Sequence, residues 1–202
     1  MKEQYYDELL NISTVGDQKG YNKSYHYHRY EPTPYCALGL LFKQYELKST
    51  DHIVDFGCGK GRLNFFIHHL FHASVTGIEM NETLYKEAVE NQKNYLKQNK
   101  NAKDKIQFHC CLAEKYEIDP LDNRFYFFNP FTVPIFWKII NKILASVEKF
   151  KREVDVILYY PSEDYIYLLE NVTLFELKTE VQLPGLYENN QNERFLIYRL
   201  SY

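Results

Sequence analysis

The 202-residue sequence lacks a long apolar run, closely spaced cysteine pairs and a strong excess of either charge. No stretch approaches the roughly 20 apolar residues of a membrane span, and the polar start Met-Lys-Glu-Gln-Tyr-Tyr-Asp is unlike a signal peptide. The formal net charge of −3 gives no strong attraction to nucleic acids. We therefore expect a cytoplasmic protein that binds no membrane, and the charge does not indicate a nucleic-acid partner.

The sequence also lacks a metal-binding pattern. Its four cysteines stand at positions 36, 58, 110 and 111, without the C-x-x-C spacing of a zinc site, and no disulfide framework follows from them. His68, His69 and His72 lie close together but lack the acid of an H-E-x-x-H motif. We predict a solvated helix end at these histidines and no metal.

What the sequence does contain is a glycine-rich turn. Residues 52–56 form a β-branched, apolar run that leads into Gly57, Gly59 and Gly61. Glycines let the backbone turn sharply and approach a ligand closely, and a helix that follows directs free N–H groups toward it. The pattern predicts a strand, a cofactor loop and a helix, although a tight turn in any α/β protein is the alternative.

The spacing of these glycines separates three classes of cofactor loop. A dinucleotide fingerprint requires a third glycine where Arg62 stands, and a P-loop requires Ser or Thr where Gly61 stands. The remaining pattern, Asp-x-Gly-x-Gly-x-Gly, resembles the first motif of class I S-adenosylmethionine-dependent methyltransferases. The resemblance implies S-adenosylmethionine as the cofactor. It implies these cofactor-binding residues: Asp55, Gly57, Cys58, Gly59 and Gly61.

Glu79 lies about 20 residues after the glycine loop, at the offset where such folds place an acid that binds ribose. Residues 74–80 read as a buried strand, and Glu79 lies near its carboxyl end. In the family that the glycine motif resembles, this carboxylate accepts hydrogen bonds from both ribose hydroxyls, which implies cofactor contacts from Glu79 and the adjacent Met80. A solvated surface glutamate is the alternative.

Strand and helix patterns alternate from residue 50 onward, which predicts a parallel sheet covered on both faces. The predicted strands are 52–57, 74–80, 106–111, 124–129 and 155–160, and the predicted helices are 36–46, 60–71, 82–99, 132–150 and 162–170. Two further strand patterns, about 173–183 and 194–201, flank a polar turn and should pair antiparallel. This is the layout of the class I methyltransferase sheet. We expect one α/β domain: a three-layer Rossmann-like sandwich with a mostly parallel seven-stranded sheet and a C-terminal antiparallel hairpin.

Residues 1–30 precede this core, which spans 31–202, as a polar arm rich in tyrosine. Such an arm is a disordered tail, an oligomer contact or a lid, and we predict a lid or wall over the site. The tyrosines of the arm are Tyr5, Tyr6, Tyr21, Tyr25, Tyr27 and Tyr30. The sequence indicates no oligomeric state.

The segment 29–35, Arg-Tyr-Glu-Pro-Thr-Pro-Tyr, contains two prolines that favour an extended loop before a helix. It also resembles the Tyr-x-Pro-Thr-Pro segment of some class I methyltransferases, including relatives that modify protein lysines. There the loop closes over the methionine part of the cofactor. The resemblance therefore implies cofactor contacts from Tyr30 and Thr33.

After the third predicted strand, the family often has Gly-Asp-Ala, but this chain has Leu112 and Ala113 before Glu114. The aspartate that would accept from the adenine amino group is absent at position 112. Adenine recognition is then expected from backbone groups near Leu112 and Ala113 and from apolar contact, with Glu114 as a further candidate.

The fourth predicted strand ends in Asn129-Pro130-Phe131. This resembles the motif of amino-group methyltransferases, Asn or Asp followed by Pro-Pro and an aromatic residue, but it is one proline short. The resemblance implies that Asn129 contacts the cofactor and orients the substrate, with Pro130 beside it and Phe131 as a wall. These three are the predicted catalytic residues, and a strand end with a proline-bounded turn is the alternative.

These motifs together predict methyl transfer from S-adenosylmethionine to an unidentified acceptor. A small molecule is slightly favoured because the chain is short and acidic, followed by protein lysine and a nucleic-acid base. A non-catalytic S-adenosylmethionine-binding module and an NAD enzyme are competing classes. Methyl transfer from a sulfonium needs mainly proximity and alignment. The aromatic residues expected near the positive sulfur are Tyr27, Tyr30, Tyr35, Phe131, Tyr159 or Tyr160.

Overall fold

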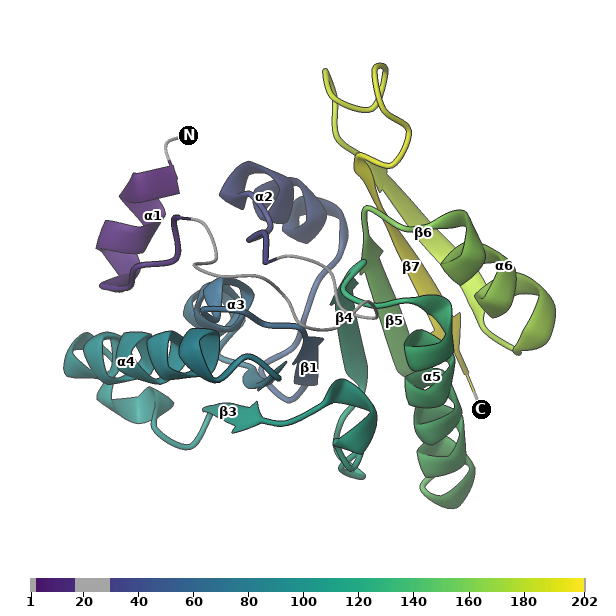
Figure 1. Ribbon diagram of the computed structural model, residues 1–202, viewed down its shortest axis with the longest axis horizontal. Helices are drawn as coiled ribbons and strands as arrows, with labels where there is room; N and C mark the ends of the chain where they lie inside the picture. The colour runs from purple at the N-terminus through teal and green to yellow at the C-terminus, as the bar shows by residue number, and fades with distance from the viewer. Residues whose placement is uncertain (1–2, 17–29, 202) are drawn as a thin grey trace.

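The computed structural model describes residues 3–16 and 30–201 (Figure 1). Their strands form one seven-stranded sheet in the order β3-β2-β1-β4-β5-β7-β6. The strands are β1 (His52–Phe56), β2 (Ser74–Glu79), β3 (Ile106–Cys110), β4 (Arg124–Phe128), β5 (Val154–Tyr159), β6 (Glu176–Gln182) and β7 (Arg194–Leu200). Strands β1 to β5 pair in parallel, whereas β7 pairs antiparallel with both β5 and β6. The predicted sheet and its C-terminal hairpin are confirmed.

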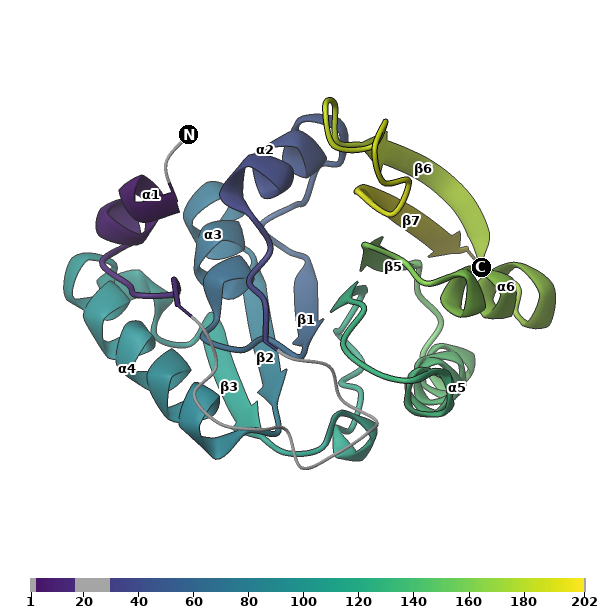
Figure 2. The same cartoon turned by 45° about the horizontal axis from the view of Figure 1, so that its top comes forward.

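Helices cover both faces of this sheet. They are α1 (Glu3–Leu10), α2 (Tyr35–Gln44), α3 (Arg62–Phe71), α4 (Glu82–Gln98), α5 (Val133–Lys149) and α6 (Glu163–Val172), with the short turns η1 (Lys100–Ala102) and η2 (Ala113–Lys115). Figures 1 and 2 show α1 to α4 on one side and α5 and α6 on the other. Adjacent strand residues point to opposite layers: Ile53 packs in the core with Phe65, and Val54 packs in the core with Ile140. The predicted three-layer sandwich is confirmed.

The strand order positions a ligand site. Strands β1 and β4 are neighbours, with β2 and β3 on one side of them and β5 on the other, so the order of strands reverses between β1 and β4. In open α/β sheets, ligands bind beyond the carboxyl ends of the strands at such a switch point. We therefore expect the functional site at the segments that follow β1 and β4.

Two local predictions were wrong. The helix predicted over 60–71 begins at Arg62, because Gly61 has a φ of 84° in the left-handed region. The predicted solvated helix end does not describe His68, which is 6% exposed and has its Nδ1 atom 2.8 Å from the Tyr95 hydroxyl oxygen. Burial, with the nearby His72, lowers the pKa of His68 to about 4, so its ring is neutral at pH 7.

The N-terminal arm has structure that its composition did not indicate. Its described part contains helix α1, whereas Tyr21, Tyr25 and Tyr27 lie outside the described residues. In the part of the chain that the structure describes, no helix is long and apolar enough to cross a membrane. The same residues contain no group of three or more metal-ligating side chains.

A buried ion-pair network lies where β4 and β5 begin, at the end of the sheet opposite the glycine loop. The Asp155 side chain is fully buried and accepts from Arg199 Nε at 2.7 Å and from Arg199 Nη2 at 2.8 Å. The Tyr45 hydroxyl donates to the same carboxylate at 2.6 Å, and Arg124 Nε lies 3.4 Å from it. A buried carboxylate is desolvated, so the folded protein tolerates the charge of Asp155 only because these partners compensate it.

Candidate functional site

A left-handed glycine loop connects β1 to α3. Gly57, Gly59 and Gly61 have φ angles of 83°, 54° and 84°, which residues with side chains rarely adopt. The Gly57 N–H donates to the Ile78 carbonyl oxygen at 2.8 Å, and the Gly61 N–H donates to the Cys58 carbonyl oxygen at 2.9 Å. The loop is thus fixed against β2 before it turns into α3.

The glycine loop touches two of the other predicted segments. A Cβ at Gly57 would lie 2.9 Å from Pro130 Cβ, after β4. A Cβ at Gly59 would lie 2.0 Å from the Tyr30 ring, in the segment before α2. The structure therefore brings together three motifs that are far apart in the sequence, and side chains at either glycine would separate them.

Two buried carboxylates lie beside this loop, on β1 and β2. Glu79 Oε2 accepts from the Gly59 N–H at 3.0 Å, and Glu79 Oε1 accepts from the Asn81 N–H at 2.7 Å. In the amide orientation that satisfies its neighbours, Asn64 donates to Asp55 Oδ2 at 3.0 Å. Burial, with the nearby Glu79 carboxylate, raises the pKa of Asp55 to about 8, and burial also raises the pKa of Glu79. A cationic ligand would let both groups ionise, so the pair favours a cation here.

The segment that contains α1 forms a wall beside the glycine loop. The buried Arg62 donates from Nε to Thr14 Oγ1 at 2.8 Å and from Nη1 to the Glu3 carboxylate. The Thr14 hydroxyl donates to Asp7 Oδ1 at 2.7 Å, and the Tyr30 hydroxyl donates to the Thr14 carbonyl oxygen at 2.9 Å. A buried polar network therefore holds this wall on α3, and Tyr30 connects it to the loop.

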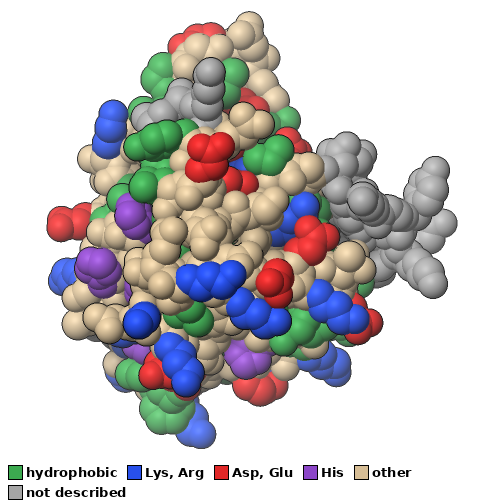
Figure 3. Space-filling view, turned by 90° about the vertical axis from the view of Figure 1, so that its left-hand side faces the viewer, with side chains coloured by type: hydrophobic (Ala, Val, Ile, Leu, Met, Phe, Trp, Pro, Cys, Tyr) green, Lys and Arg blue, Asp and Glu red, His purple; other side chains and the backbone are tan. Residues whose placement is uncertain are grey.

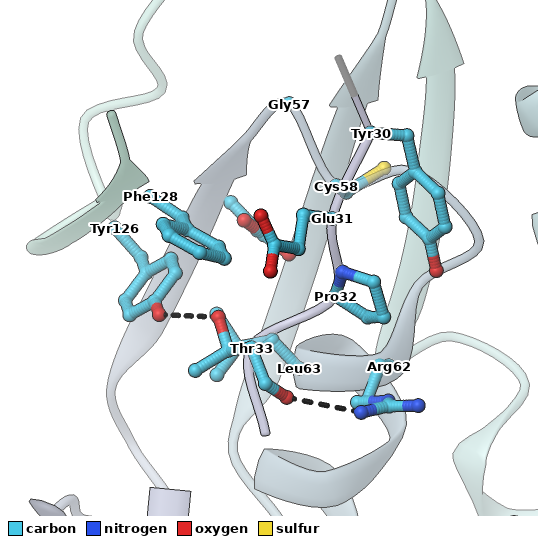
Figure 4. A pocket seen from close by; sticks show the side chains of 11 residues that line it. Tyr30, Glu31, Pro32, Thr33, Gly57, Cys58, Arg62, Leu63, Tyr126 and Phe128 are labelled. Atoms are coloured by element: carbon cyan, nitrogen blue, oxygen red, sulfur yellow. Dashed lines mark hydrogen bonds between the residues drawn. The ribbon is translucent and has the colours of Figure 1, made fainter. Parts of the chain in front are cut away.

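A narrow pocket opens at the switch point between β1 and β4; we call it the inner pocket (Figure 4). Thr33 Oγ1 lies 2.7 Å from the Tyr126 hydroxyl oxygen, and the Thr33 carbonyl oxygen accepts from Arg62 Nη1 at 3.2 Å. The lining residues are Tyr30, Glu31, Pro32, Thr33, Asp55, Gly57, Cys58, Arg62, Leu63, Tyr126 and Phe128. Several predicted cofactor residues therefore share one pocket.

The predicted catalytic residues follow β4 and divide between the site and the core. Asn129 has a φ of 38°, a left-handed backbone that is uncommon for a residue with a side chain and is found at functional sites. Pro130 lies against Gly57, as described above. Phe131 is 2% exposed and packs in the core beneath α5, where its carbonyl oxygen accepts from the Tyr165 hydroxyl at 2.7 Å.

The predicted adenine-side residues lie at the same edge of the sheet. The Cys111 N–H donates to the Glu79 carbonyl oxygen at 3.1 Å, which holds the end of β3 beside the end of β2. Met80 follows β2, and Leu112 and Ala113 follow β3. Leu112 is 39% exposed and Ala113 is buried, so this corner presents an apolar surface next to Glu79.

A second pocket adjoins the inner pocket; we call it the outer pocket. It has a volume of about 430 Å³. Its lining residues are Glu31, Pro34, Cys36, Ala37, Leu40, Phe128, Tyr159, Tyr160, Leu183, Pro184, Leu186 and Glu193. Glu31 and Phe128 line both pockets. The sequence pointed to Tyr159 and Tyr160, but it missed Glu31, inside the proline-rich segment, and Glu193, which has no local signal.

The strand order, the left-handed glycine loop and the acid at the end of β2 define the class I methyltransferase fold. Residues 37–126 match a protein family described as a methyltransferase domain. The family model thus covers the strands β1 to β3, the start of β4 and the glycine loop, and the whole chain has the class I methyltransferase fold. No curated protein matches the chain at the level of sequence.

Solved structures of methyltransferases share the fold. An RNA methyltransferase from Salinibacter ruber is 19% identical, with a TM-score of 0.59 over 84% of this chain and 92% of that chain. A putative RNA methyltransferase from Pyrococcus horikoshii is 15% identical, with a TM-score of 0.56 over 100% and 98%. Geranyl diphosphate C-methyltransferase from Streptomyces coelicolor A3(2) is 12% identical, with a TM-score of 0.52 over 81% and 76%. At these identities the likeness concerns the fold, and the acceptors differ.

Proposed function

We propose that this protein is an S-adenosylmethionine-dependent methyltransferase and that its acceptor is a small molecule bound in the outer pocket. One observation carries the proposal: Glu31 and Phe128 line both pockets. An acceptor in the outer pocket would therefore lie directly beside the inner pocket. The volume of about 430 Å³ lies within the range of small-molecule sites.

The residues around the inner pocket fit S-adenosylmethionine. The left-handed glycines let a ligand approach the loop backbone, and Glu79 stands where this fold holds a ribose. Asp55, whose carboxyl group is buried, would gain a cationic partner in the amino acid part of the cofactor. We assign the remaining contacts to Tyr30, Thr33, Gly57, Cys58, Gly59, Gly61, Met80, Leu112, Ala113 and Asn129.

S-adenosylmethionine supplies an activated methyl group when it is bound. The chain contributes alignment of the acceptor and exclusion of water. Asn129, fixed in a left-handed backbone next to Pro130, is the candidate to orient the acceptor. The rings of Phe128 and Tyr159 have centroids 4.6 Å apart and form a packed wall along the path between the pockets.

Protein lysine and nucleic-acid bases are the alternative acceptors, and two of the similar structures are described as RNA methyltransferases. The surface around α1 and α4 gives little support to a nucleic acid, because Lys and Arg side chains are interspersed there with Asp and Glu (Figure 3). On α4, Lys86 pairs with Glu82 and Lys93 pairs with Glu90. This mixing supports a small acceptor over a polyanion.

Radiolabel transfer in a cell extract tests the proposal. The protein is incubated with labelled S-adenosylmethionine, and the products are separated by size and by sensitivity to nuclease and protease. Label in a small-molecule fraction is expected. Label in nuclease-sensitive or protease-sensitive material contradicts the proposal, and cofactor binding without any transfer indicates a non-catalytic module.

A variant locates the acceptor site. Cys36 is exposed on α2 at the outer pocket, so Cys36→Trp should fill the pocket and abolish transfer while the affinity for S-adenosylhomocysteine stays unchanged. Leu70→Trp, at an exposed position of α3 outside both pockets, is the control. Normal transfer by Cys36→Trp would place the acceptor elsewhere.

A further inference from the structure

The outer pocket joins aromatic walls to two carboxylates. Glu31 and Glu193 line it together with Phe128, Tyr159 and Tyr160, and none of the described lining residues is a lysine, arginine or histidine. Within residues 3–16 and 30–201, neither glutamate forms an ion pair. A carboxylate at a partly apolar surface loses hydration, so a cationic ligand would stabilise both charges.

Glu193 is held in a fixed position. The Tyr159 hydroxyl donates to Glu193 Oε2 at 2.9 Å. The Tyr159 ring is itself stacked on Phe195, with centroids 4.5 Å apart and an angle of 25° between the planes. Burial, together with the hydrogen bond to Glu193, raises the pKa of Tyr159, so its hydroxyl remains a donor at neutral pH. The tyrosine occupies one carboxylate oxygen, and among the described residues Glu193 Oε1 has no partner.

Glu31 places the second charge at the junction of the two pockets. Figure 4 shows its side chain between Pro32 and Phe128, on the inner-pocket side. Glu193 lines the outer pocket as well, beside Tyr159, so both carboxylates belong to the lining of one pocket. A ligand held by both would therefore extend from the outer pocket toward the methyl donor.

The aromatic walls suit the same kind of ligand. The Phe128 ring centroid lies 4.6 Å from that of Tyr159 and 6.5 Å from that of Tyr160. Tyr160 has a φ of 50°, and its hydroxyl accepts from Asn190 Nδ2 at 2.7 Å. Aromatic faces attract cations and bury apolar groups, whereas two carboxylates repel phosphate and carboxylate groups.

We propose that the acceptor is a small primary or secondary amine with an apolar body, and that Glu193 and Glu31 determine this specificity. The inference rests on the proposed function of the outer pocket. The ammonium group binds between the carboxylates and loses one proton to water before transfer. The nitrogen lone pair then forms the new C–N bond while the C–S bond breaks and its electron pair stays on sulfur. The products are the methylated ammonium and S-adenosylhomocysteine.

Equilibrium binding of three matched probes tests this specificity. The probes are 2-phenylethylamine, 2-phenylethanol and 3-phenylpropanoate, each titrated by calorimetry into protein saturated with S-adenosylhomocysteine. We expect the amine to bind about 10- to 100-fold more tightly than the alcohol, from charged hydrogen bonds, and we expect no binding of the carboxylate. Equal binding of amine and alcohol, or no amine binding at millimolar concentration, overturns the proposal.

Substitutions assign the effect to the two glutamates. Glu193→Gln keeps the shape of the side chain and should weaken amine binding about tenfold, without changing the affinity for the alcohol or for S-adenosylhomocysteine. Glu31→Gln should also weaken amine binding. Glu188→Gln removes an exposed charge from the same β6–β7 connection, outside the pocket, and should have no effect. If Glu193→Gln behaves like Glu188→Gln, the proposed specificity is wrong.

The outcomes also separate this inference from the proposed function. Loss of methyl transfer in Cys36→Trp together with equal binding of amine and alcohol keeps the outer pocket as the acceptor site and refutes only the amine. Normal methyl transfer in Cys36→Trp refutes the acceptor site itself.

Discussion

Asp55 should release a proton when the cofactor binds. In the free protein, burial and the nearby Glu79 raise the pKa of Asp55 to about 8, so the carboxyl group is largely protonated at pH 7. The amino acid part of S-adenosylmethionine and of S-adenosylhomocysteine carries an ammonium group, and a cation near Asp55 favours the carboxylate. Because binding lowers the pKa of Asp55, affinity should increase as the pH rises toward about 8 and should level off above it.

The size of the effect follows from the pKa. With a pKa of about 8, Asp55 is about nine-tenths protonated at pH 7, so binding should release about 0.9 proton there. Between about pH 6.5 and about pH 8.5, the affinity should rise about 25-fold. The same shift should make the free protein less stable as the pH rises from about 4 to about 8, since the unfolded chain loses this proton at a lower pH than the folded chain.

Calorimetry with S-adenosylhomocysteine measures this proton directly. Titrations in buffers with different ionisation enthalpies give the number of protons released, and titrations across the pH range give the slope of the affinity. Asp55→Asn cannot ionise, so its affinity should be lower but much less dependent on pH. An equal pH slope in the wild type and Asp55→Asn would refute the reasoning.

Three further substitutions test the site and the fold. Glu79→Ala leaves the N–H groups of Gly59 and Asn81 without their acceptor and should lower both the stability and the cofactor affinity by about 1 to 3 kcal/mol, as measured by urea unfolding and calorimetry. Gly59→Ala should weaken cofactor binding, because its Cβ would lie 2.0 Å from the Tyr30 ring and the residue has a φ of 54°; Gly39→Ala, with open space around it, should leave binding unchanged. Asp155→Ala should destabilise the protein by about 3 to 5 kcal/mol in urea unfolding, because it removes the buried carboxylate that Arg199 donates to, and a loss below about 1 kcal/mol would contradict this account.

The fold was predictable because its signals are local. The alternation of apolar strands with helical periodicity, and the polar turn before the last strand, set the sheet and its hairpin without any long-range information. The glycine loop and Glu79 were predictable for the same reason, since their spacing along the chain reflects one β-α-β unit.

The outer pocket was not predictable, because its charges come from distant parts of the chain. Glu31 precedes α2 and Glu193 precedes β7. The antiparallel pairing of β7 with β5 places Glu193 beside Tyr159, in the pocket that Glu31 also lines. The prediction for His68 was wrong for a related reason. Its position near a helix end indicated exposure to solvent, but Tyr95 of α4 covers it. In both cases tertiary packing decides what a local pattern leaves open.

Arg62 bears both on the class of cofactor and on the attachment of the N-terminal segment. In the sequence it only ruled out the dinucleotide fingerprint, whose third glycine permits close contact at the start of the helix. In the structure its buried guanidinium stands where that glycine would be, and it donates to Thr14, Glu3 and the Thr33 carbonyl oxygen. A glycine here would remove the anchor of the N-terminal wall, because the Thr14 hydroxyl oxygen and the Glu3 carboxylate would lose this donor. The residue that narrows the cofactor class is therefore also the one that attaches the N-terminal segment to the cofactor loop.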